Sequence, residues 1–183
     1  MKKTFTFFSI AVIALLIIAS CSNKEQANMI KDKKTLADVI AAVDEKFAET
    51  YGSDYTAVAM RMPIDEQYLS DYCDIDAASI DEYAGYVSMS MTNSDVFLAV
   101  KAKEGKSEEV KQALDKRLND LEAQYEMYPV NGSYERVKAG GVYSKGDYIF
   151  LIVVGVMGGA AFETPDFSGD VQMVKATIDS MFT

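Results

Sequence analysis

The sequence predicts an α+β domain, a two-layer sandwich in which an antiparallel sheet from two hairpins carries helices packed on one face. Two observations lead to this fold class. Segments with helical spacing of apolar residues alternate with pairs of short apolar runs, in the order helix, hairpin, helix, hairpin, helix. Each pair of runs is joined by a short turn, as in an antiparallel hairpin. Helices on one side of such a sheet are the simplest way to bury every apolar face.

The first predicted helix begins at Thr35, which stands three residues before Asp38 as in a capping box. Apolar residues then recur at helical spacing, at Leu36, Val39, Ile40, Val43 and Phe47. Tyr51-Gly52 ends this helix. An extended segment over 55–62 and a short helix over 65–72 are expected next.

The first hairpin is predicted from strands over 83–91 and 96–103, with turn chemistry at Asn93-Ser94-Asp95. Ser107 is expected to cap the longest helix that follows. Its buried stripe consists of Val110, Leu114, Leu118, Leu121 and Tyr125. Pro129 ends this helix.

The second hairpin is predicted over 139–144 and 148–154, turning at Lys145-Gly146-Asp147. Residues 149–154 (IFLIVV) are apolar throughout, which suits a central strand covered on both faces, although an antiparallel sheet often leaves one face in water. A glycine-rich loop over 155–165 follows. The final helix is marked by Val171, Val174, Ile178 and Met181.

The first twenty residues resemble a bacterial lipoprotein signal. Lys2 and Lys3 precede an uncharged stretch over 4–20, which is shorter than the roughly 20 apolar residues needed to span a bilayer. Ile18-Ala19-Ser20-Cys21 is similar to a lipobox, which implies cleavage before Cys21 and a diacylglyceryl thioether on its sulfur, whose glycerol carries fatty acyl chains such as palmitate. Stable anchoring takes two acyl chains, and a diacylglyceryl group supplies them. The alternative is an uncleaved anchor in which Cys21 is incidental, and both alternatives place the remainder outside the cytoplasm.

The chain therefore divides into a signal peptide (1–20), a lipidated Cys21 with a polar tether (21–34) and a single domain (35–183). Beyond residue 20 the chain keeps 16 of the 18 basic side chains and all 28 acidic ones. The resulting negative net charge repels nucleic acid and anionic lipid headgroups, so a nucleic-acid partner is not expected.

The absence of histidine excludes several classes of site. Without histidine the chain cannot build a Ser-His-Asp or Cys-His catalytic centre, or a zinc site with histidine ligands. Once Cys21 is acylated, Cys73 is the remaining thiol, so no intramolecular disulfide and no thiolate zinc site is expected. The sequence indicates no cofactor.

The acidic stretch over 71–82 is the candidate ligand site. Its carboxylates are Asp71, Asp74, Asp76, Asp81 and Glu82. Clustered carboxylates bind calcium, and millimolar affinity suffices outside the cell. The spacing does not match an EF-hand, however, since Gly85 stands where the bidentate glutamate belongs, and a solvated loop is the simpler interpretation. Two of these acids could also serve as the acid and base of a hydrolase.

Other patterns admit a binding role beside a structural one. Gly155-Val156-Met157-Gly158-Gly159 lacks the Gly-Lys-Ser/Thr ending of a phosphate loop and is interpreted as a connection. Lys116-Arg117 could present a cation to an anionic ligand, or be neutralised by acids along the same helix. Six tyrosines could line a partner surface or pack in the core: Tyr68, Tyr72, Tyr83, Tyr86, Tyr125 and Tyr128. Methionines 60, 62, 89 and 91 are expected to pack between strands.

Four segments resemble a family of small lipoproteins from Firmicutes that is described as a domain of unknown function. They are Met62-Pro63-Ile64-Asp65-Glu66, residues 95–106 (DVFLAVKAKEGK), Tyr128-Pro129, and residues 145–150 (KGDYIF). The resemblance covers about residues 35–183. It implies a surface-tethered α+β domain in a Gram-positive envelope, and supplies no catalytic residues.

The sequence thus predicts a lipid-anchored extracytoplasmic module that binds an envelope protein or glycan and is not an enzyme. Its expected contact surface combines residues 65–86 with the loop over 155–165. The alternatives are a carboxylate-based envelope hydrolase and a calcium-stabilised structural domain.

Overall fold

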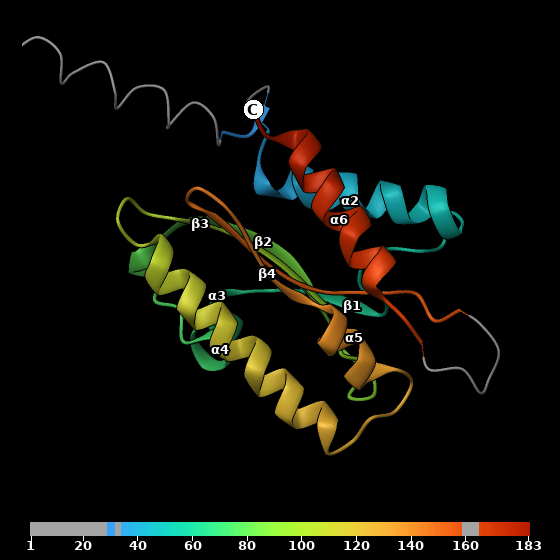
Figure 1. Cartoon of the computed structure of the whole chain (residues 1–183). Helices are drawn as coiled ribbons and strands as arrows, with labels where there is room; N and C mark the ends of the chain where they lie inside the picture. The colour runs from blue at the N-terminus through green and yellow to red at the C-terminus, as the bar shows by residue number, and fades with distance from the viewer. Residues whose placement is uncertain (1–28, 32–33, 159–164) are drawn as a thin grey trace, which may run out of the picture.

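The computed structural model describes residues 29–31, 34–158 and 165–183. The predicted signal over 1–20, Cys21 and most of the tether lie outside the described residues, as do residues 159–164 of the glycine-rich loop. The elements in chain order are α2 (Leu36–Tyr51), β1 (Arg61–Pro63), α3 (Glu66–Cys73), η3 (Ala77–Ser79), β2 (Ile80–Ser88), β3 (Val96–Ala102), α4 (Ser107–Glu126), α5 (Ser133–Ala139), β4 (Gly141–Lys145), β5 (Tyr148–Val153) and α6 (Ser168–Met181). Figure 1 shows their arrangement.

In the described part of the chain, five strands form one antiparallel sheet in the order β1-β2-β3-β5-β4. The two predicted hairpins are β2–β3 and β4–β5, and they join through β3 and β5, where Ala99 stands opposite Phe150. The short strand β1 extends the sheet beside β2. The α+β class, with helices packed on an antiparallel sheet, is confirmed.

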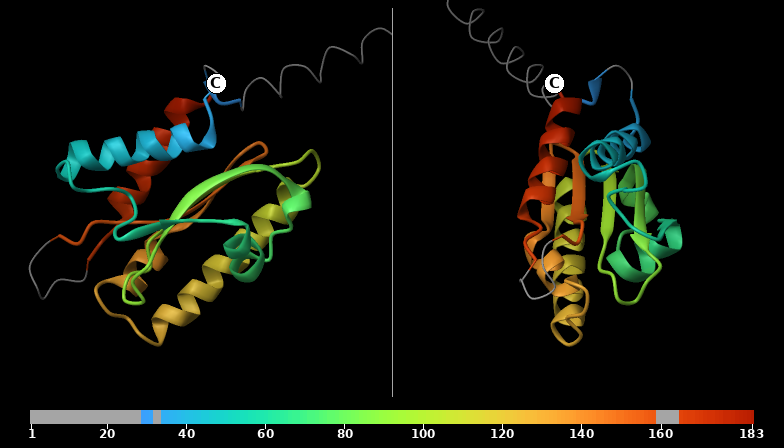
Figure 2. Two further views of the ribbon diagram at one scale, coloured as in Figure 1. Left: turned by 180° about the vertical axis from the view of Figure 1, so that it is seen from behind. Right: turned by 90° about the vertical axis from the view of Figure 1, so that its right-hand side faces the viewer.

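The helices lie on both faces of the sheet, whereas the sequence analysis placed them on one. Helices α2 and α6 cover one face, and α3, α4 and α5 cover the other (Figure 2). The cause is visible in β3, whose first five side chains, from Val96 to Val100, are all apolar and buried. Phe97 and Ala99 pack under α2 and α6, while Val96, Leu98 and Val100 pack under α4. Since neither face could be left in water, the two-layer prediction is wrong and the domain has three layers.

Local signals set most helix ends as expected. Thr35 forms a reciprocal capping box with Asp38, and Asp65 caps α3 by accepting a hydrogen bond from the Tyr68 backbone N–H at 2.8 Å. Ser107 is not the cap of α4. Lys106 occupies that position, and the Ser107 hydroxyl donates to Asp147 instead. The predicted stripe of α4 is buried, with Leu118 partly so.

The short helix α5 is absent from the predicted order of elements. It begins after Asn131 and Gly132, which both adopt left-handed backbone angles, with φ of 53° and 66°. The turn packs Gly132 against the residues that follow β5, since a Cβ there would lie 2.9 Å from the sulfur of Met157. Helix α5 thereby connects α4 to β4 in the chain and packs beside the end of β5.

Thr35→Ala is expected to lower the free energy of unfolding by about 1 kcal/mol, because the first turn of α2 loses its side-chain cap. Thr50→Ala is the matched control, since the exposed Thr50 hydroxyl donates to a carbonyl within the same helix. Urea unfolding of both variants measures the difference. Equal losses from the two substitutions would show that the capping box adds nothing to stability.

The chain enters the described domain beside its C-terminus (Figure 1). The Met29 carbonyl accepts a hydrogen bond from the Thr183 backbone N–H, and Ile30 pairs with Phe182. The backbone N–H of Leu36 donates to Glu82 at 2.8 Å, so α2 starts where β2 starts. None of the helices within the described ranges is long and apolar enough to cross a membrane.

Candidate functional site

The five predicted acids are divided among separate structural contacts. Glu82 caps α2, and Asp76 caps η3 by accepting from the Ala78 backbone N–H at 2.8 Å. Asp74 forms an ion pair with Lys116 at 2.9 Å, while Asp81 lies 4.0 Å from Lys101. Asp71 accepts hydrogen bonds from its α3 neighbours Gln67 and Ser70.

Two of these acids, Asp74 and Asp76, line a hollow of about 570 Å³ between α3 and η3. Each carboxylate already has the partner described above, so neither is positioned as an isolated acid or base. Within the described residues, no group of three or more acidic or cysteine side chains is arranged to hold a metal ion. The structure therefore does not bring the five acids together.

A buried ion pair between Asp95 and Arg136 lies at the other end of the sheet, where β2 ends and β3 begins. The two side chains are each 4% exposed, and Arg136 Nε lies 2.9 Å from Asp95 Oδ1. The Nε hydrogen itself is donated to the Gly155 carbonyl at 3.1 Å, so the contact to Oδ1 is an ion pair without a hydrogen bond. Burial raises the pKa of Asp95, and the Arg136 charge opposes that rise.

The ion pair contacts three loops and the helix α5. Asp95 Oδ2 accepts hydrogen bonds from the Ala59 backbone N–H at 3.2 Å and from Asn93 at 3.0 Å. Arg136 holds Gly155, as described above. Ala59 precedes β1, Asn93 lies in the β2–β3 turn, Arg136 lies on α5 and Gly155 follows β5. One buried charge pair therefore positions loops that come from distant parts of the sequence.

A second buried carboxylate, that of Asp170 in the first turn of α6, holds the start of the glycine-rich loop. It accepts hydrogen bonds from the Val156 backbone N–H at 2.9 Å and from the Tyr51 hydroxyl. The hydrogen bond to Asp170 raises the pKa of Tyr51 to about 12. The Val156 N–H is therefore bound to a carboxylate and is not free to meet a phosphate, which agrees with the interpretation of this loop as a connection.

Exposed methionines lie in and beside the loops held by the ion pair. We call this the methionine surface, and it comprises Met60, Met62, Met89, Met91, Met127 and Met157, with Tyr72 and Tyr128. Exposure of the methionines runs from 43% at Met62 to 87% at Met91. The prediction that methionines 60, 62, 89 and 91 pack between strands is therefore wrong. Strand β1 lies at the sheet edge, and Met89 and Met91 lie at the β2–β3 turn.

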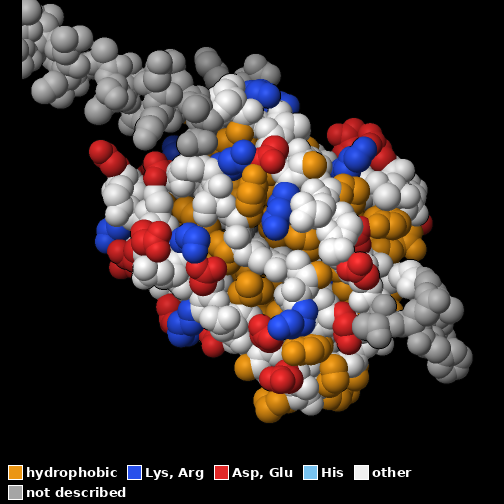
Figure 3. All heavy atoms as spheres, viewed as in Figure 1, with side chains coloured by type: hydrophobic (Ala, Val, Ile, Leu, Met, Phe, Trp, Pro, Cys, Tyr) orange, Lys and Arg blue, Asp and Glu red, His pale blue; other side chains and the backbone are white. Residues whose placement is uncertain are grey.

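Contacts between the loops place these side chains at one end of the domain. The Met89 backbone N–H donates to the Met60 carbonyl at 3.0 Å, and the Tyr125 hydroxyl donates to the Asn93 carbonyl at 3.0 Å. Met157 lies against Gly132, before α5. Hydrophobic side chains gather at the lower end of the molecule in Figure 3, where α4 meets α5.

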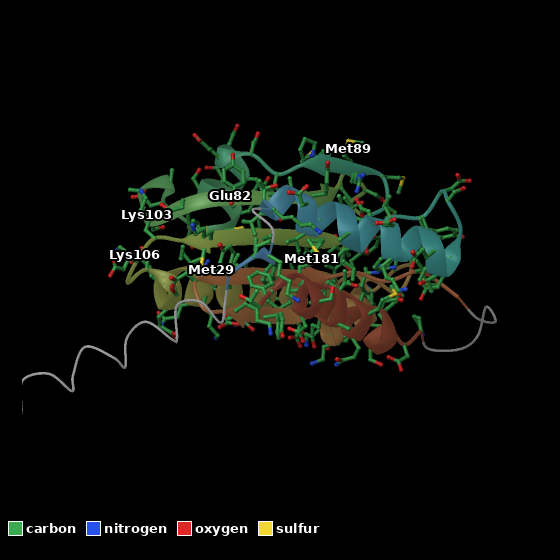
Figure 4. All side chains as sticks on the ribbon, turned by 90° about the horizontal axis from the view of Figure 1, so that it is seen from above. Met29, Glu82, Met89, Lys103, Lys106 and Met181 are labelled. Carbon is green, nitrogen blue, oxygen red and sulfur yellow. The ribbon has the colours of Figure 1, made fainter. Side chains whose placement is uncertain are left out.

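This end lies away from the point where the chain enters. Figure 4 shows Met29 and Glu82 toward one end of the sheet and Met89 toward the other. Strand β2 runs between the two ends, from Ile80 to Ser88. The methionine surface and the point where the chain enters the described domain are therefore at opposite ends of the sheet.

A smaller hollow, of about 230 Å³, opens in the methionine surface between α3, α4 and the β2–β3 turn. We call it the Arg117 hollow, since Arg117 lies in its wall together with Met62, Tyr68, Tyr72, Met89 and Met91. The adjacent basic residues Lys116 and Arg117 have different surroundings. Lys116 is neutralised by Asp74 and Asp120, at 2.9 and 3.1 Å, whereas Arg117 packs against the rings of Tyr68 and Tyr72.

Cys73 is expected to be unreactive in the folded protein. It is buried at the end of α3, and burial raises the pKa of its thiol to about 11, so little thiolate is present near pH 8. A colorimetric disulfide reagent should label a chain beginning at Ser22 slowly at pH 8 and fully in urea. Equally rapid labelling with and without urea would contradict the burial of this thiol.

Sequence reasoning found part of this site. It identified Tyr68, Tyr72 and Arg117 as potential binding residues, and it placed residues 65–86 and the loop over 155–165 on the contact surface. It missed the Asp95–Arg136 pair, because the two residues come from different elements. No local signal marks the pair, since Asp95 follows Asn93-Ser94 and Arg136 stands next to Glu135.

Comparison with known proteins gives a family and no close relative. No match was found among curated proteins or among solved structures. Residues 53–154, which run from the end of α2 through β5, match the family described as Domain of unknown function (DUF4358). This match spans more than half of the chain and includes Asp95, Arg117 and Arg136. The chain therefore belongs to the DUF4358 family.

Proposed function

We propose that this chain is a lipid-anchored module on the outer face of the cytoplasmic membrane that binds an envelope protein and performs no catalysis. The methionine surface is the observation that carries the proposal. Exposed apolar patches rimmed by polar residues mark sites of protein interaction. Methionine side chains are flexible and polarisable, so they adapt to the shape of a partner.

The proposed anchor is consistent with the position of the methionine surface. Cys21, in its lipobox-like setting, stands eight residues before Met29, where the described domain begins. Attachment there would hold the domain by the end opposite the methionine surface. The resemblance to small lipoproteins from Firmicutes supports the same arrangement.

A protein partner is favoured over a bilayer or a glycan. The formal net charge of −10 opposes adhesion to anionic headgroups. Thioethers offer no hydrogen-bond donor and are weak acceptors, so they match sugar hydroxyls poorly. They are well suited to apolar side chains of another protein, and methionine is enriched at protein interfaces.

The anchor is tested by replacing Cys21 with serine in the producing cells. The unaltered protein is expected in the membrane fraction, with a diacylated N-terminal peptide beginning at Cys21 by mass spectrometry. The Cys21→Ser variant is expected to keep its first twenty residues and to carry no lipid. An unmodified Cys21 in the unaltered protein would reject the anchor.

The binding surface is tested by placing carboxylates in it. The double variant Met89→Asp/Met91→Asp should recover at least tenfold less partner from solubilised membranes than the unaltered protein does. The reason is that unpaired charges would be desolvated in the interface. Ala176→Asp, on the exposed side of α6, is the matched control and should bind normally. Equal recovery with both variants would reject the methionine surface as the binding site.

A further inference from the structure

Arg117 differs from the other two arginines in having no carboxylate partner among residues 29–31, 34–158 and 165–183. Arg61 forms an ion pair with Asp44, and Arg136 forms one with Asp95. Among the described residues, no aspartate or glutamate oxygen lies within 4 Å of Arg117. A guanidinium group favours a bidentate pair with a carboxylate, so this side chain has unused binding capacity.

Two aromatic rings hold the Arg117 guanidinium in place. Its central carbon lies 5.7 Å from the centre of the Tyr68 ring and 5.4 Å from that of Tyr72, and these rings stack on each other at 5.0 Å. Nη2 donates a long hydrogen bond, of 3.4 Å, to the Tyr68 hydroxyl. Nε is buried and has no hydrogen-bond partner in the described structure. The group is therefore positioned by packing, while a donor is left without an acceptor.

The walls of the Arg117 hollow combine exposed apolar side chains with polar groups from the β2–β3 turn, including Ser90 and Asn93. Met89, Met91 and Tyr72 contribute to them, and the hollow volume is about 230 Å³. Sites for drug-sized ligands occupy about 300–1,000 Å³, so this hollow suits a single amino-acid residue or a group of similar size. Asp95 also reaches the wall, but Arg136 balances its charge.

The local charges leave Arg117 available to an anion. Asp74 and Asp120 form ion pairs with Lys116 and not with Arg117. We propose that the Arg117 hollow binds a carboxylate that stands next to an apolar or aromatic side chain, with Arg117 pairing the carboxylate and the methionines enclosing the side chain. The inference rests on the proposed binding function and names the chemistry of its ligand. In a peptide ligand, the bound carboxylate belongs either to the C-terminus or to an acidic side chain.

Titration with small probes tests this site directly. The full chain, ¹⁵N-labelled in a nonionic detergent, gives one Nε–H signal for each arginine, and Arg117→Lys identifies that of Arg117. N-acetyl-phenylalanine should move the Arg117 signal saturably and leave those of Arg61 and Arg136 in place. N-acetyl-phenylalanine amide, which has the same ring and no charge, should shift it at least tenfold less at equal concentration.

A second pair of probes separates the two sources of the carboxylate. Acetyl-Phe-Glu-amide carries it on a side chain, and acetyl-Phe-Gln-amide is its neutral control. If the glutamate probe binds more tightly than N-acetyl-phenylalanine, the site recognises an acidic side chain. The opposite order assigns it to a C-terminus, and either result supports the inference.

Variants assign the binding to particular side chains. Arg117→Gln should abolish the response to carboxylate probes, read from the Tyr72 ring signals, whereas Ala176→Asp, on α6 and outside the hollow, should leave it unchanged. An Arg117 signal that no carboxylate probe moves, or that the amide moves equally, would overturn the inference. If partner recovery still depends on Met89 and Met91 in that case, the proposed function survives while the carboxylate site does not.

Discussion

Arg136→Met is expected to lower the free energy of unfolding by about 3–5 kcal/mol, because it leaves the buried carboxylate of Asp95 without its counter-charge. The methionine side chain replaces much of the lost volume, so the cost arises chiefly from the charge. The carboxylate of Asp170 adds to it, since its negative charge disfavours ionised Asp95. The variant also loses the hydrogen bond to Gly155, which follows β5.

The loss is expected to depend on pH. Burial raises the pKa of Asp95 above its usual 3.8, and removing Arg136 takes away the charge that opposes this rise. The folded variant then holds its proton to a higher pH than the unfolded chain does. Relative to the unaltered protein, the contribution of Asp95 to the stability of the variant is therefore most favourable below about pH 4 and falls as the pH rises through the raised pKa of Asp95.

The double variant Asp95→Leu/Arg136→Met is the control for this effect. It removes both charges, so it is expected to be more stable than Arg136→Met at pH 7 and to lack the additional pH dependence. Urea unfolding at several pH values from 4 to 8, referred to the unaltered protein, measures both. A loss below about 1 kcal/mol for Arg136→Met would mean that the pair is not buried as described.

Phe97→Ala and Leu98→Ala are each expected to destabilise the domain strongly, although the two side chains point to opposite faces of β3. Phe97 is buried under α2 and α6, and Leu98 is buried under α3 and α4. Replacing a buried phenylalanine by alanine costs about 3–5 kcal/mol, and replacing a buried leucine costs about 2–5 kcal/mol. A sheet with one face in water would show a large loss at one of these positions only.

Lys101→Ala is the matched control on the same strand. Its ammonium is partly exposed, with a long contact to Asp81, so its replacement should change the free energy of unfolding by less than about 1 kcal/mol. Thermal or urea unfolding of the three variants provides the comparison. A small effect at either Phe97 or Leu98 would restore the two-layer architecture.

The fold was predictable where the signal is local. Helix α2 is specified by neighbouring residues, with the capping box at Thr35 and a stripe that ends at Phe47. The distribution of helices over two faces was not inferred, although residues 149–154 are apolar at every position. Strand β3 shows why this signal is ambiguous, since a run such as 96–100 identifies a buried strand without identifying what covers it.

The candidate site was less predictable because it depends on contacts between distant segments. Methionines 89 and 91 alternate with serines as in a half-buried strand. No neighbouring residue indicates that they lie in the turn between β2 and β3, where α4 does not cover them. Arg117 was recognised as a cation next to acids on its own helix. Its lack of a carboxylate partner follows from the packing of Tyr68 and Tyr72 on α3, which determines where the side chain lies.

Site-specific photo-crosslinking in the producing cells tests the central claim, that the methionine surface is where the domain binds its partner. A photoreactive residue at Met91 or at Tyr128 is expected to give the same protein adduct, and Met89→Asp should abolish it. The same residue at Ala176 on α6 should not give that adduct. Adducts to lipid alone at Met91, or the same protein adduct in equal yield from Ala176, would contradict the account.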